Sequence, residues 1–476
     1  MLKSYNTAFK LVRHMATSAS KSPKLTDVFI VGGGPAGLGL ATGIKTSSKL
    51  KHLNTVLVDG GDIKGKVAPF YDNPPDFYTN RVVSVTHPTR EFIEDKLGAT
   101  LRKDRIMSYD GICVTDGVSK GLIDMERPGM AWMVEILNVQ SSLLNRINQL
   151  KPSGFNLLDK TKVVDIKYSD PEDASSWILV SLDNGETYKT RLLIGADGFN
   201  SRVKTFSGIL SQGWFYNKSA VVATMKLDME PLKIRGWQRF LPTGPIAHLP
   251  LPGDNATLVW STTNELAKLL TSIPVEQFTE LVNAAFVLED VDMKYYYNQL
   301  MNGKMTTTEL KEDVQFRTNQ ILASLSDESM ADDIYPPPIT DVLDHTRAKF
   351  PLKLFHADTY CQERIALLGD AAHATHPLAG QGLNMGLCDT DALVRALESA
   401  TDRGLDVGSL FALEPFWSER YPINCKLLSL ADNCHKIYSN TFPPIVGMRT
   451  LGANIINQIG PIKDYISGTL SYSGKY

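Results

Sequence analysis

The pattern of apolar and polar residues near the start of the chain predicts a strand, a turn and a helix in succession. Residues 28–31 form a short run of apolar residues, typical of a buried parallel strand. Apolar residues then recur at helical spacing, at Leu38, Leu40, Ala41 and Ile44. The next apolar run, NTVLVDGG, predicts a second strand that ends at Asp59. This order indicates an α/β unit with a parallel sheet.

Two later apolar runs also end in an acidic residue. Residues 191–196 and 365–368 are each typical of a strand, followed by Asp197-Gly198 and Gly369-Asp370 respectively. In open α/β sheets, ligands bind at this carboxyl edge of the strands. The stretch HPLAGQGLNMG, residues 376–386, follows and leads into a helix that we expect to begin near residue 383. Its glycines would let the backbone approach a flat ring system, and the helix amides would stabilise negative charge there.

The middle and the end of the chain follow other patterns. SAVVATMKLDM (219–229) and TLVWSTT (257–263) are typical of strands and predict a second sheet. Residues 309–340 are charged and then proline-rich, which favours a surface helix followed by a stiff linker. Residues 441–470 predict a helix with a wide apolar face. We favour burial of this face against its own domain, with a membrane or partner interface as the alternative.

Length and composition narrow the class of protein. The 476 residues exceed what one core usually organises, so we expect at least two domains. A net charge of −3 without long like-charged blocks does not support nucleic-acid binding, and the five scattered cysteines indicate free thiols. No apolar run approaches the ~20 residues of a spanning helix. Residues 1–24 are basic, rich in serine and free of acids, which favours a mitochondrial transit peptide over a plain disordered tail.

The first turn carries a dinucleotide-binding pattern. Gly32, Gly34 and Gly37 have G-x-G-x-x-G spacing between the first strand and the helix. They would permit the tight turn, the approach of the backbone to a pyrophosphate, and close packing of helix on strand. Asp59 follows at the distance expected of a ribose-binding acid. This acid favours FAD or NAD over NADP.

Three stretches together resemble one flavoprotein family. GGGPAGL, GADGFNSRV and GDAAHATHPLAGQGLNMG resemble the monooxygenases of the para-hydroxybenzoate hydroxylase type. HPLAGQGLNMGLCD matches the narrower signature of the ubiquinone (coenzyme Q) biosynthesis hydroxylases, and residues 237–251 resemble their mitochondrial members.

The resemblance implies an α/β fold with a non-contiguous FAD-binding Rossmann-type domain, an interleaved β-rich substrate domain and C-terminal helices. The implied FAD-binding segments are 25–110, 135–208 and 361–400. The implied substrate domain comprises 111–134 and 209–360, and residues 401–476 form the helical C-terminal region.

The resemblance also implies which residues bind FAD. They are Gly32, Gly34, Gly37, Asp59, Arg81, Asp197, Gly198, Asp370, Pro377, Gly380, Leu383 and Asn384. The chain departs from the family pattern at Ile136, Thr115 and Lys204, and the first departure puts one FAD contact in doubt.

No catalytic base is identified from the sequence. His373 and His376 are three residues apart, but no third ligand lies near them in the sequence, so we predict no metal site. A packing or hydrogen-bonding role is the favoured interpretation of both histidines, and a role as general base is the alternative.

The implied reaction is hydroxylation of a polyprenylated 4-hydroxybenzoate-type ring with O₂, through a peroxyflavin, in ubiquinone biosynthesis. The implied location is the matrix side of the mitochondrial inner membrane, peripherally bound or in a biosynthetic complex. Ferredoxin and its reductase are the expected electron donors, and a basic docking patch is predicted at Lys226, Lys233, Arg235 and Arg239, with a solvated face as the alternative interpretation. The alternative functions are an NADPH-reduced hydroxylase of another aromatic substrate and a FAD-bearing scaffold without turnover.

Overall fold

The computed structural model describes residues 22–230, 233–325 and 329–471. The predicted transit segment, residues 1–24, lies outside this range except for its last three residues. Lys24 is the first residue of strand β1 (Lys24–Val31). Within the described ranges, no helix is long and apolar enough to cross a membrane.

A first sheet contains the predicted strand, turn and helix unit. Its parallel strands have the order β17–β9–β1–β2–β6, with β16 beside β17 at one edge, β8 paired to β9, and β7 paired to β8. The strands after β1 are β2 (Thr55–Val58), β6 (Phe155–Leu158), β7 (Val163–Tyr168), β8 (Ile178–Leu182), β9 (Thr187–Gly195), β16 (Cys361–Gln362) and β17 (Ile365–Leu367). The strands predicted from the apolar runs before Asp59, Asp197 and Asp370 are therefore confirmed.

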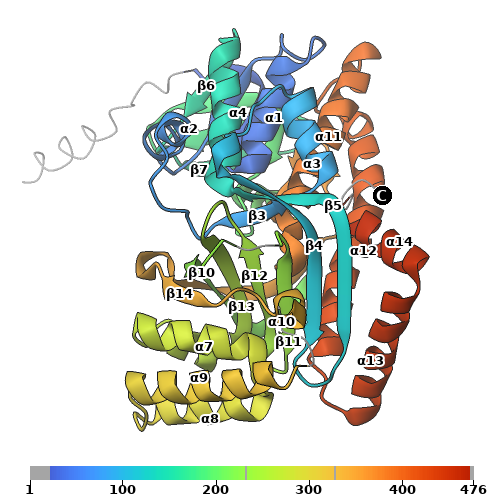
Figure 1. The fold of residues 1–476 in the computed structure, drawn as a ribbon. Coiled ribbons are helices and arrows are strands. Elements are labelled where there is room, and N and C mark those ends of the chain that lie inside the picture. Colours follow the sequence, from blue (N-terminus) through green and yellow to red (C-terminus); the bar gives the residue numbers. More distant parts are fainter. Residues whose placement is uncertain (1–21, 231–232, 326–328, 472–476) are drawn as a thin grey trace, which may run out of the picture.

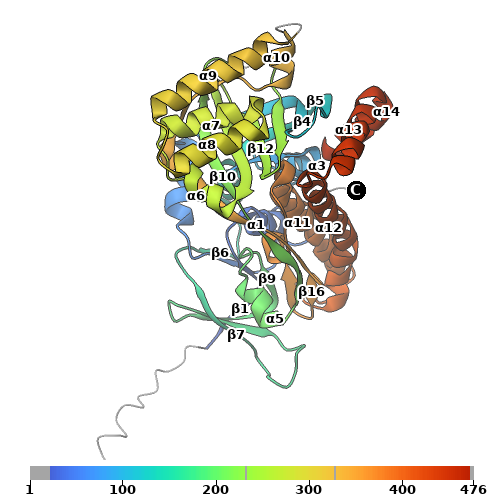
Figure 2. The same cartoon turned by 90° about the horizontal axis from the view of Figure 1, so that it is seen from below.

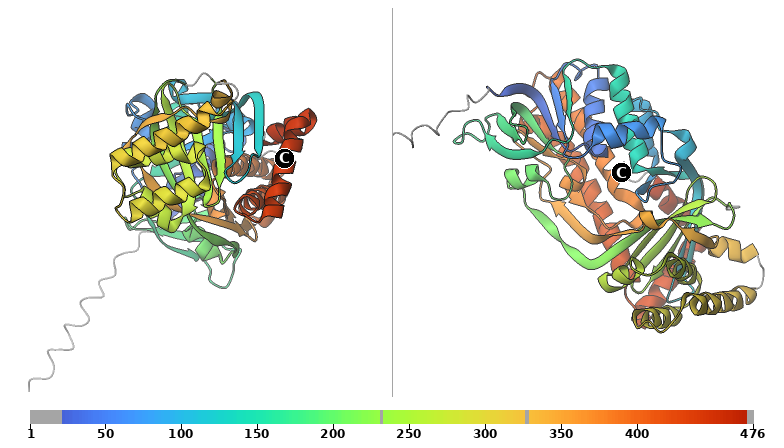
Figure 3. Two further views of the ribbon diagram at one scale, coloured as in Figure 1. Left: turned by 60° about the horizontal axis from the view of Figure 1, so that its bottom comes forward. Right: turned by 90° about the vertical axis from the view of Figure 1, so that its left-hand side faces the viewer.

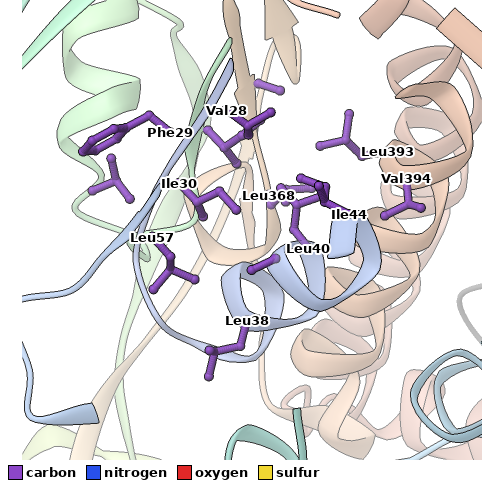
Figure 4. Packing of buried hydrophobic residues seen from close by; sticks show 14 of the residues in the cluster. Val28, Phe29, Ile30, Leu38, Leu40, Ile44, Leu57, Leu368, Leu393 and Val394 are labelled. Atoms are coloured by element: carbon purple, nitrogen blue, oxygen red, sulfur yellow. The ribbon is translucent and has the colours of Figure 1, made fainter. Parts of the chain in front are cut away.

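Three helices pack together beside this sheet, and each buries apolar residues at helical spacing. They are α1 (Pro35–Thr46), α4 (Ile136–Leu150) and α11 (Gln381–Asp402). Figure 4 shows Val28 and Ile30 of β1, Leu40 and Ile44 of α1, and Leu393 of α11 gathered in one buried cluster. Shorter helices surround this region, namely α2 (Ala68–Asp72), α3 (His87–Glu91) and α5 (Arg202–Ser207).

A second sheet has the order β18–β15–β10–β13–β12–β11–β4–β5–β3, with β14 paired to β10. Its strands are β3 (Val82–Val85), β4 (Ile106–Asp116), β5 (Leu122–Glu135), β10 (Ser211–Leu227), β11 (Gly236–Leu241), β12 (Gly244–Pro250), β13 (Asn255–Thr263), β14 (Ile339–Val342), β15 (Ala348–Ala357) and β18 (His373–Ala374). The predicted second sheet is confirmed, because β10 and β13 lie side by side in it.

Helices cover one face of the second sheet. They are α6 (Asn264–Leu270), α7 (Val275–Val287), α8 (Asp290–Met301), α9 (Thr307–Ala323) and α10 (Ser329–Ile334), and α7 to α9 form a layer beneath the sheet (Figure 1). Helix α9 confirms the surface helix predicted within residues 309–340. The predicted linker after it is wrong in part, because α10 and β14 lie there and Ile339 and Val342 are buried in the sheet's core.

The C-terminal region contains α12 (Leu410–Tyr438), α13 (Pro443–Gln458) and α14 (Gly460–Ser471). The predicted single helix over 441–470 is divided in two, because Ile459 leaves helical geometry at φ −104° and ψ 91°. The predicted burial of its apolar face is wrong, since Met448 is 67% and Leu451 61% exposed. Helices α13 and α14 lie on the outer flank of the molecule, away from α7 to α9 (Figures 2 and 3).

Candidate cofactor site

The carboxyl edge of the first sheet brings the predicted residues together. The Gly32 amide donates to the Val58 carbonyl over 2.8 Å, which joins the ends of β1 and β2. A Cβ on Gly32 would lie 2.2 Å from the Ala196 carbonyl oxygen, so only glycine allows this approach, and its φ of +108° also requires glycine. The Leu368 amide donates to the Gly195 carbonyl over 2.9 Å. The glycine turn, Asp197 and Asp370 therefore share one edge.

Helix α1 begins at this edge with its first turn open. Gly34 is its N-cap, no side chain caps it, and its first turn carries no acid. No atom lies within 4 Å of a Cβ built on Gly34, whereas one built on Gly37 would meet the Gly32 carbonyl oxygen at 1.9 Å. Gly37 thus permits close packing, as predicted, and Gly34 leaves space at a helix terminus suited to an anion.

Asp59 is held beside the same turn. Its carboxylate accepts hydrogen bonds from the Gly33 and Gly61 amides, each over 2.6 Å. From α4, the Gln140 side chain donates to the Gly33 carbonyl over 2.9 Å. Sequence reasoning missed Gln140, because it follows the glycines by more than a hundred residues and belongs to no motif.

Two acidic residues at the edge, Asp197 and Asp370, have carboxylate oxygens available to a ligand. One Asp197 oxygen accepts from the Arg202 amide over 2.8 Å, while the other is buried and bonded to no described residue. Burial raises the pKa of Asp197. Gly198 beside it has a φ of +81° and open space at its Cβ position. Asp370 is exposed, and no described residue donates a hydrogen bond to its carboxylate.

The glycine-rich loop is fixed to the second sheet. Gly380 caps α11 with a φ of +62°, and a Cβ there would lie 3.1 Å from the Ser84 amide nitrogen. The Asn384 side chain donates to the Ser84 carbonyl over 2.7 Å and accepts from the Thr86 amide over 3.1 Å. Asn384 therefore holds the loop against β3. Pro377 and Leu383 are half-buried in this loop.

Arg81 immediately precedes β3 and is exposed. Its carbonyl accepts from the Ile136 amide over 2.9 Å. Beside Ile136, where the chain departs from the family pattern, the carboxylate of the fully buried Glu135 accepts from the Thr79 amide over 2.7 Å and from Arg105 over 2.6 Å. Glu135 therefore supports the strand rather than facing the edge.

These features fit FAD. The uncapped terminus of α1 and the open positions at Gly34 and Gly198 suit a pyrophosphate. Asp59 and the unpartnered oxygen of Asp197 suit hydroxyl donors. Helix α11 also lacks a side-chain cap and an acid in its first turn, which suits a ring that gains negative charge.

The two histidines of the loop differ in their surroundings. The favoured interpretation of His373 as a hydrogen-bonded residue is confirmed, because it is buried 2.5 Å from an Asp389 oxygen. Arg420 contacts the other Asp389 oxygen over 2.9 Å. Burial opposes ionisation of Asp389, but His373 and Arg420 hold its pKa down to about 2. The described residues contain no group of three or more His, Cys, Asp or Glu side chains that could hold a metal.

His376 is fully buried and packs against other rings. Its ring lies 4.9 Å from that of His435 and 5.4 Å from that of Tyr216. Neither ring nitrogen has a hydrogen-bond partner among the described residues. Burial, with smaller contributions from His435 and Lys218, lowers the pKa of His376 to about 3. His376 is therefore neutral at neutral pH.

The predicted basic docking patch is wrong. Arg235 is buried and pairs with Asp124, and the buried Arg239 donates to the Ala285 carbonyl. The other two cations, Lys226 and Lys233, pair with Asp254 and Asp333. Two of the four residues are thus internal and the other two are neutralised, so they form no free basic surface.

The fold and the edge of the first sheet define a flavoprotein of the FAD-dependent monooxygenase class. A family model described as "FAD binding domain" matches residues 131–407. The mitochondrial ubiquinone biosynthesis monooxygenase COQ6 of Saccharomyces cerevisiae is 59% identical over 467 residues, covering 98% of each chain. The proteins of the same name from Schizosaccharomyces pombe and Homo sapiens are 39% and 32% identical, covering 94% and 96% of this chain and 91% and 94% of their own. The chain belongs to this family of ubiquinone biosynthesis monooxygenases, and its cofactor is FAD.

Solved structures share the fold at low sequence identity. A probable FAD-dependent monooxygenase of Pseudomonas aeruginosa, PqsL, matches with a TM-score of 0.62 and 18% identity, covering 91% of this chain and all of its own. The p-nitrophenol 4-monooxygenase PnpA of Pseudomonas putida matches with a TM-score of 0.65 and 14% identity, covering 95% and 99%. The predicted α/β fold class is confirmed.

Proposed function

We propose that this chain hydroxylates the aromatic ring of a polyprenylated 4-hydroxybenzoate-type intermediate of ubiquinone biosynthesis, in mitochondria, with O₂ and FAD. Membership of a family whose members bear that pathway in their names carries the proposal. The intact glycine framework and the open positions at Gly34 and Gly198 favour turnover over a scaffold role.

An apolar cluster beside the glycine-rich loop supports a prenylated substrate. The Ser84 hydroxyl bonds to the buried Tyr109 hydroxyl over 2.7 Å, and Ser84 also adjoins Gly380. Tyr109 belongs to a cluster on β4, β5 and β12, here called the inner cluster. Its members include Tyr109, Met125, Met133 and Leu251, with half-buried Ile112, Val114, Ile123 and Leu249 packed against them. The half-buried residues expose apolar area, from which a prenyl chain would displace water.

The residues of the chain would hold and shield the reacting groups. Asp59, Asp197, Asp370 and the first turns of α1 and α11 would bind FAD, which when reduced supplies the oxygen-activating chemistry. Asn384 fixes the glycine-rich loop against β3, and this contact would position the backbone of the loop relative to the ring of the substrate. The inner cluster excludes water from the substrate side.

The test is product formation in air by the FAD-loaded full chain, supplied with two electrons per turnover either by NADPH, ferredoxin and its reductase or by chemical reduction of the bound flavin. We expect a hydroxylated ring product from a short-tailed prenyl 4-hydroxybenzoate, with one O₂ consumed per product. Hydroxylation of 4-hydroxybenzoate without a tail, at an equal rate, would point to the alternative of another aromatic substrate. Full flavin loading without oxygen uptake for either compound would favour the scaffold alternative.

We also propose that ferredoxin and its reductase supply the electrons. Because the four cations first predicted form no patch, the candidates are Lys204 and Lys353, which flank the Phe199 ring at 5.3 and 3.4 Å. Burial lowers the pKa of both lysines, and it is opposed by Asp197 at Lys204 and by Asp370 at Lys353. Phe199 directly follows Asp197-Gly198, which places this positive charge near the cofactor site, where it would attract an acidic partner.

The donor is tested by comparing rates of flavin reduction. Ferredoxin with its reductase and NADPH should support turnover that falls with added salt. The double variant Lys204→Ala, Lys353→Ala should lower that rate. The control Lys226→Ala should not, because Lys226 pairs with Asp254. Flavin content measured in each variant separates lost cofactor from lost docking. Rapid, substrate-stimulated reduction by NADPH alone would overturn the proposal.

We further propose that the chain acts on the matrix side of the inner membrane, bound peripherally or within a biosynthetic complex. Fractionation of mitochondria with a carbonate wash tests this location, since a peripheral protein is released from the membrane.

We also propose that the chain is divided into a FAD-binding domain (25–110, 135–208 and 361–400) and a substrate domain (111–134 and 209–360).

A further inference from the structure

The last two helices expose a run of large apolar side chains, here called the α13–α14 face. Single exposed apolar residues are ordinary, but a set concentrated on two successive helices marks an interaction surface. Its members are Phe442 (61% exposed), Met448 (67%), Leu451 (61%), Ile455 (42%), Ile459 (42%), Ile462 (38%) and Tyr465 (71%).

This face is nearly free of charge. Between Phe442 and Tyr465 the ionisable side chains are Arg449, Lys463 and Asp464, and the last two stand together at one end. Arg449 is buried and donates to both oxygens of Asp116, over 2.6 and 2.8 Å. It therefore adds no charge to the outer surface. The stretch from Phe442 to Ile462 exposes no charged side chain, so it offers a charged partner nothing to pair with and matches the apolar part of a lipid bilayer.

The two ends of the face carry residues suited to the membrane boundary. Phe442 stands at the start of α13, and Tyr465, with Lys463 two residues before it, stands in α14. Aromatic and lysine side chains prefer the headgroup level, where an apolar body and a polar tip are both accommodated. Figures 2 and 3 show α13 and α14 on an outer flank, which leaves them accessible to a flat surface.

The inner side of α14 connects this face to the inner cluster. Ile466 and Leu470 pack against the inner cluster, whose members include Met125. Tyr109 of the same cluster is hydrogen-bonded to Ser84, which adjoins Gly380 of the glycine-rich loop. One short helix thus has apolar side chains toward both the solvent and the proposed substrate surface. A lipid tail could pass between the two along the apolar side chains of α14, beside Arg127, whose guanidinium lies against Gly468.

We propose that the α13–α14 face rests on the lipid bilayer and that α14 is the element past which the prenyl tail enters. This inference deepens the proposed function and rests on it for the identity of the tail. The occupant is the lipid surface itself, with the helices lying in its interface rather than crossing it.

The test is flotation of the FAD-loaded full chain with vesicles of phosphatidylcholine and cardiolipin. We expect the wild-type protein to float with the vesicles. Leu451→Glu combined with Ile455→Glu should lower the partition coefficient by at least about tenfold, because two apolar side chains leave the interface and two charges replace them. The matched control is Phe411→Glu on α12, which is 77% exposed but outside the face, and it should float like the wild type.

A second measurement keeps folding and activity apart from docking. Flavin content and oxygen uptake with a short-tailed, water-soluble substrate should be unchanged in the double variant, while uptake with a long-tailed substrate in vesicles falls. Equal flotation of wild type and double variant would overturn the inference, as would wild-type protein that does not float. A wild-type dimer that the double variant converts to monomers would also overturn it, by assigning the face to a second copy. If the wild-type protein shows no activity with the short-tailed substrate, the proposed function is contradicted, while the flotation result still tests the membrane contact of the α13–α14 face.

Discussion

At the scale of single residues, Gly34 combines an open Cβ position with a place at the uncapped start of α1. A side chain there would meet no protein atom, so any effect must come from a ligand. We predict that Gly34→Val lowers the flavin content of the purified protein at least about tenfold, because it fills space reserved for the pyrophosphate. Absorbance near 450 nm measures the bound flavin.

The matched control for this change is Gly452→Val on α13, where a Cβ also meets nothing within 4 Å. This variant should stay as yellow as the wild type. A fully yellow Gly34→Val protein would show that the glycine turn does not hold FAD.

Asp370 is exposed and bonded to no described residue, which leaves its carboxylate available to a cofactor hydroxyl. We predict that Asp370→Ala weakens FAD binding by roughly 1.5–3 kcal/mol, the usual contribution of a charge-assisted hydrogen bond. Excess FAD should restore part of the activity. An unchanged dissociation constant in a titration of the apoprotein would remove Asp370 from the site.

His376 makes stability depend on pH. Burial lowers its pKa to about 3, whereas an unfolded histidine titrates near ~6.5. Below pH ~6.5 the unfolded chain therefore binds the extra proton and the folded chain does not, so stability falls as the pH falls. One such histidine should lose about 1 kcal/mol of the free energy of unfolding between pH 6.5 and 5.5.

We predict that His376→Asn removes this share of the pH dependence in urea unfolding, while His52→Asn, at an exposed position, does not. His435, whose pKa burial and Lys218 lower to about 4, retains its own share in both variants. Equal pH dependence in His376→Asn and wild type would contradict the assignment.

At the scale of elements, a buried network joins α11 to α12. Asp389 of α11 accepts from Arg420 and Asn424 of α12, each over 2.9 Å, and from His373. Because Asp389 is fully buried, its charge depends on these partners. We predict that Arg420→Met costs about 3–5 kcal/mol in the free energy of unfolding, since it leaves a buried carboxylate short of one cation.

The same two helices offer an exposed control. Arg395 of α11 pairs with Glu419 of α12 over 2.7 Å, and both side chains are more than two-fifths exposed. Arg395→Met should therefore cost no more than about 1 kcal/mol. Urea unfolding of both variants measures the difference, and equal losses would place the stabilising interaction elsewhere than in the buried network.

At the scale of the whole molecule, the proposed FAD contacts come from both sheets. The glycine turn follows β1 in the first sheet, whereas the loop at Gly380 is tied by Asn384 to β3 in the second. FAD at a hundred times its dissociation constant should stabilise the protein by about 2.7 kcal/mol. We predict slower hydrogen exchange on FAD addition in peptides covering both β1 and β3. Protection confined to β1 and α1 would mean that the loop does not contact the cofactor.

The sequence alone determined the local elements around the cofactor, because their signals are local. The spacing of apolar residues and glycines over short stretches of sequence predicts three elements. They are the strand before Gly32, the helix after Gly37 and the strand that ends at Asp59. The same holds for the strands that precede Asp197 and Asp370, and the strand order then places all these groups at one edge.

Only the tertiary structure decided which polar and apolar side chains face water. Arg235 is consistent with a surface patch in sequence, but in the fold it is buried just before β11 and pairs with Asp124. Gln140 contacts the glycine turn only because α4 packs beside α1. The spacing of the apolar residues after Pro443 predicts a helix, but it does not tell whether that helix is buried or exposed. In the structure the helix is broken at Ile459 and α13 packs on β5, which leaves Leu451 exposed to solvent. Periodicity specifies which side chains share a face of a helix, but the neighbour that covers that face is a property of the assembled fold.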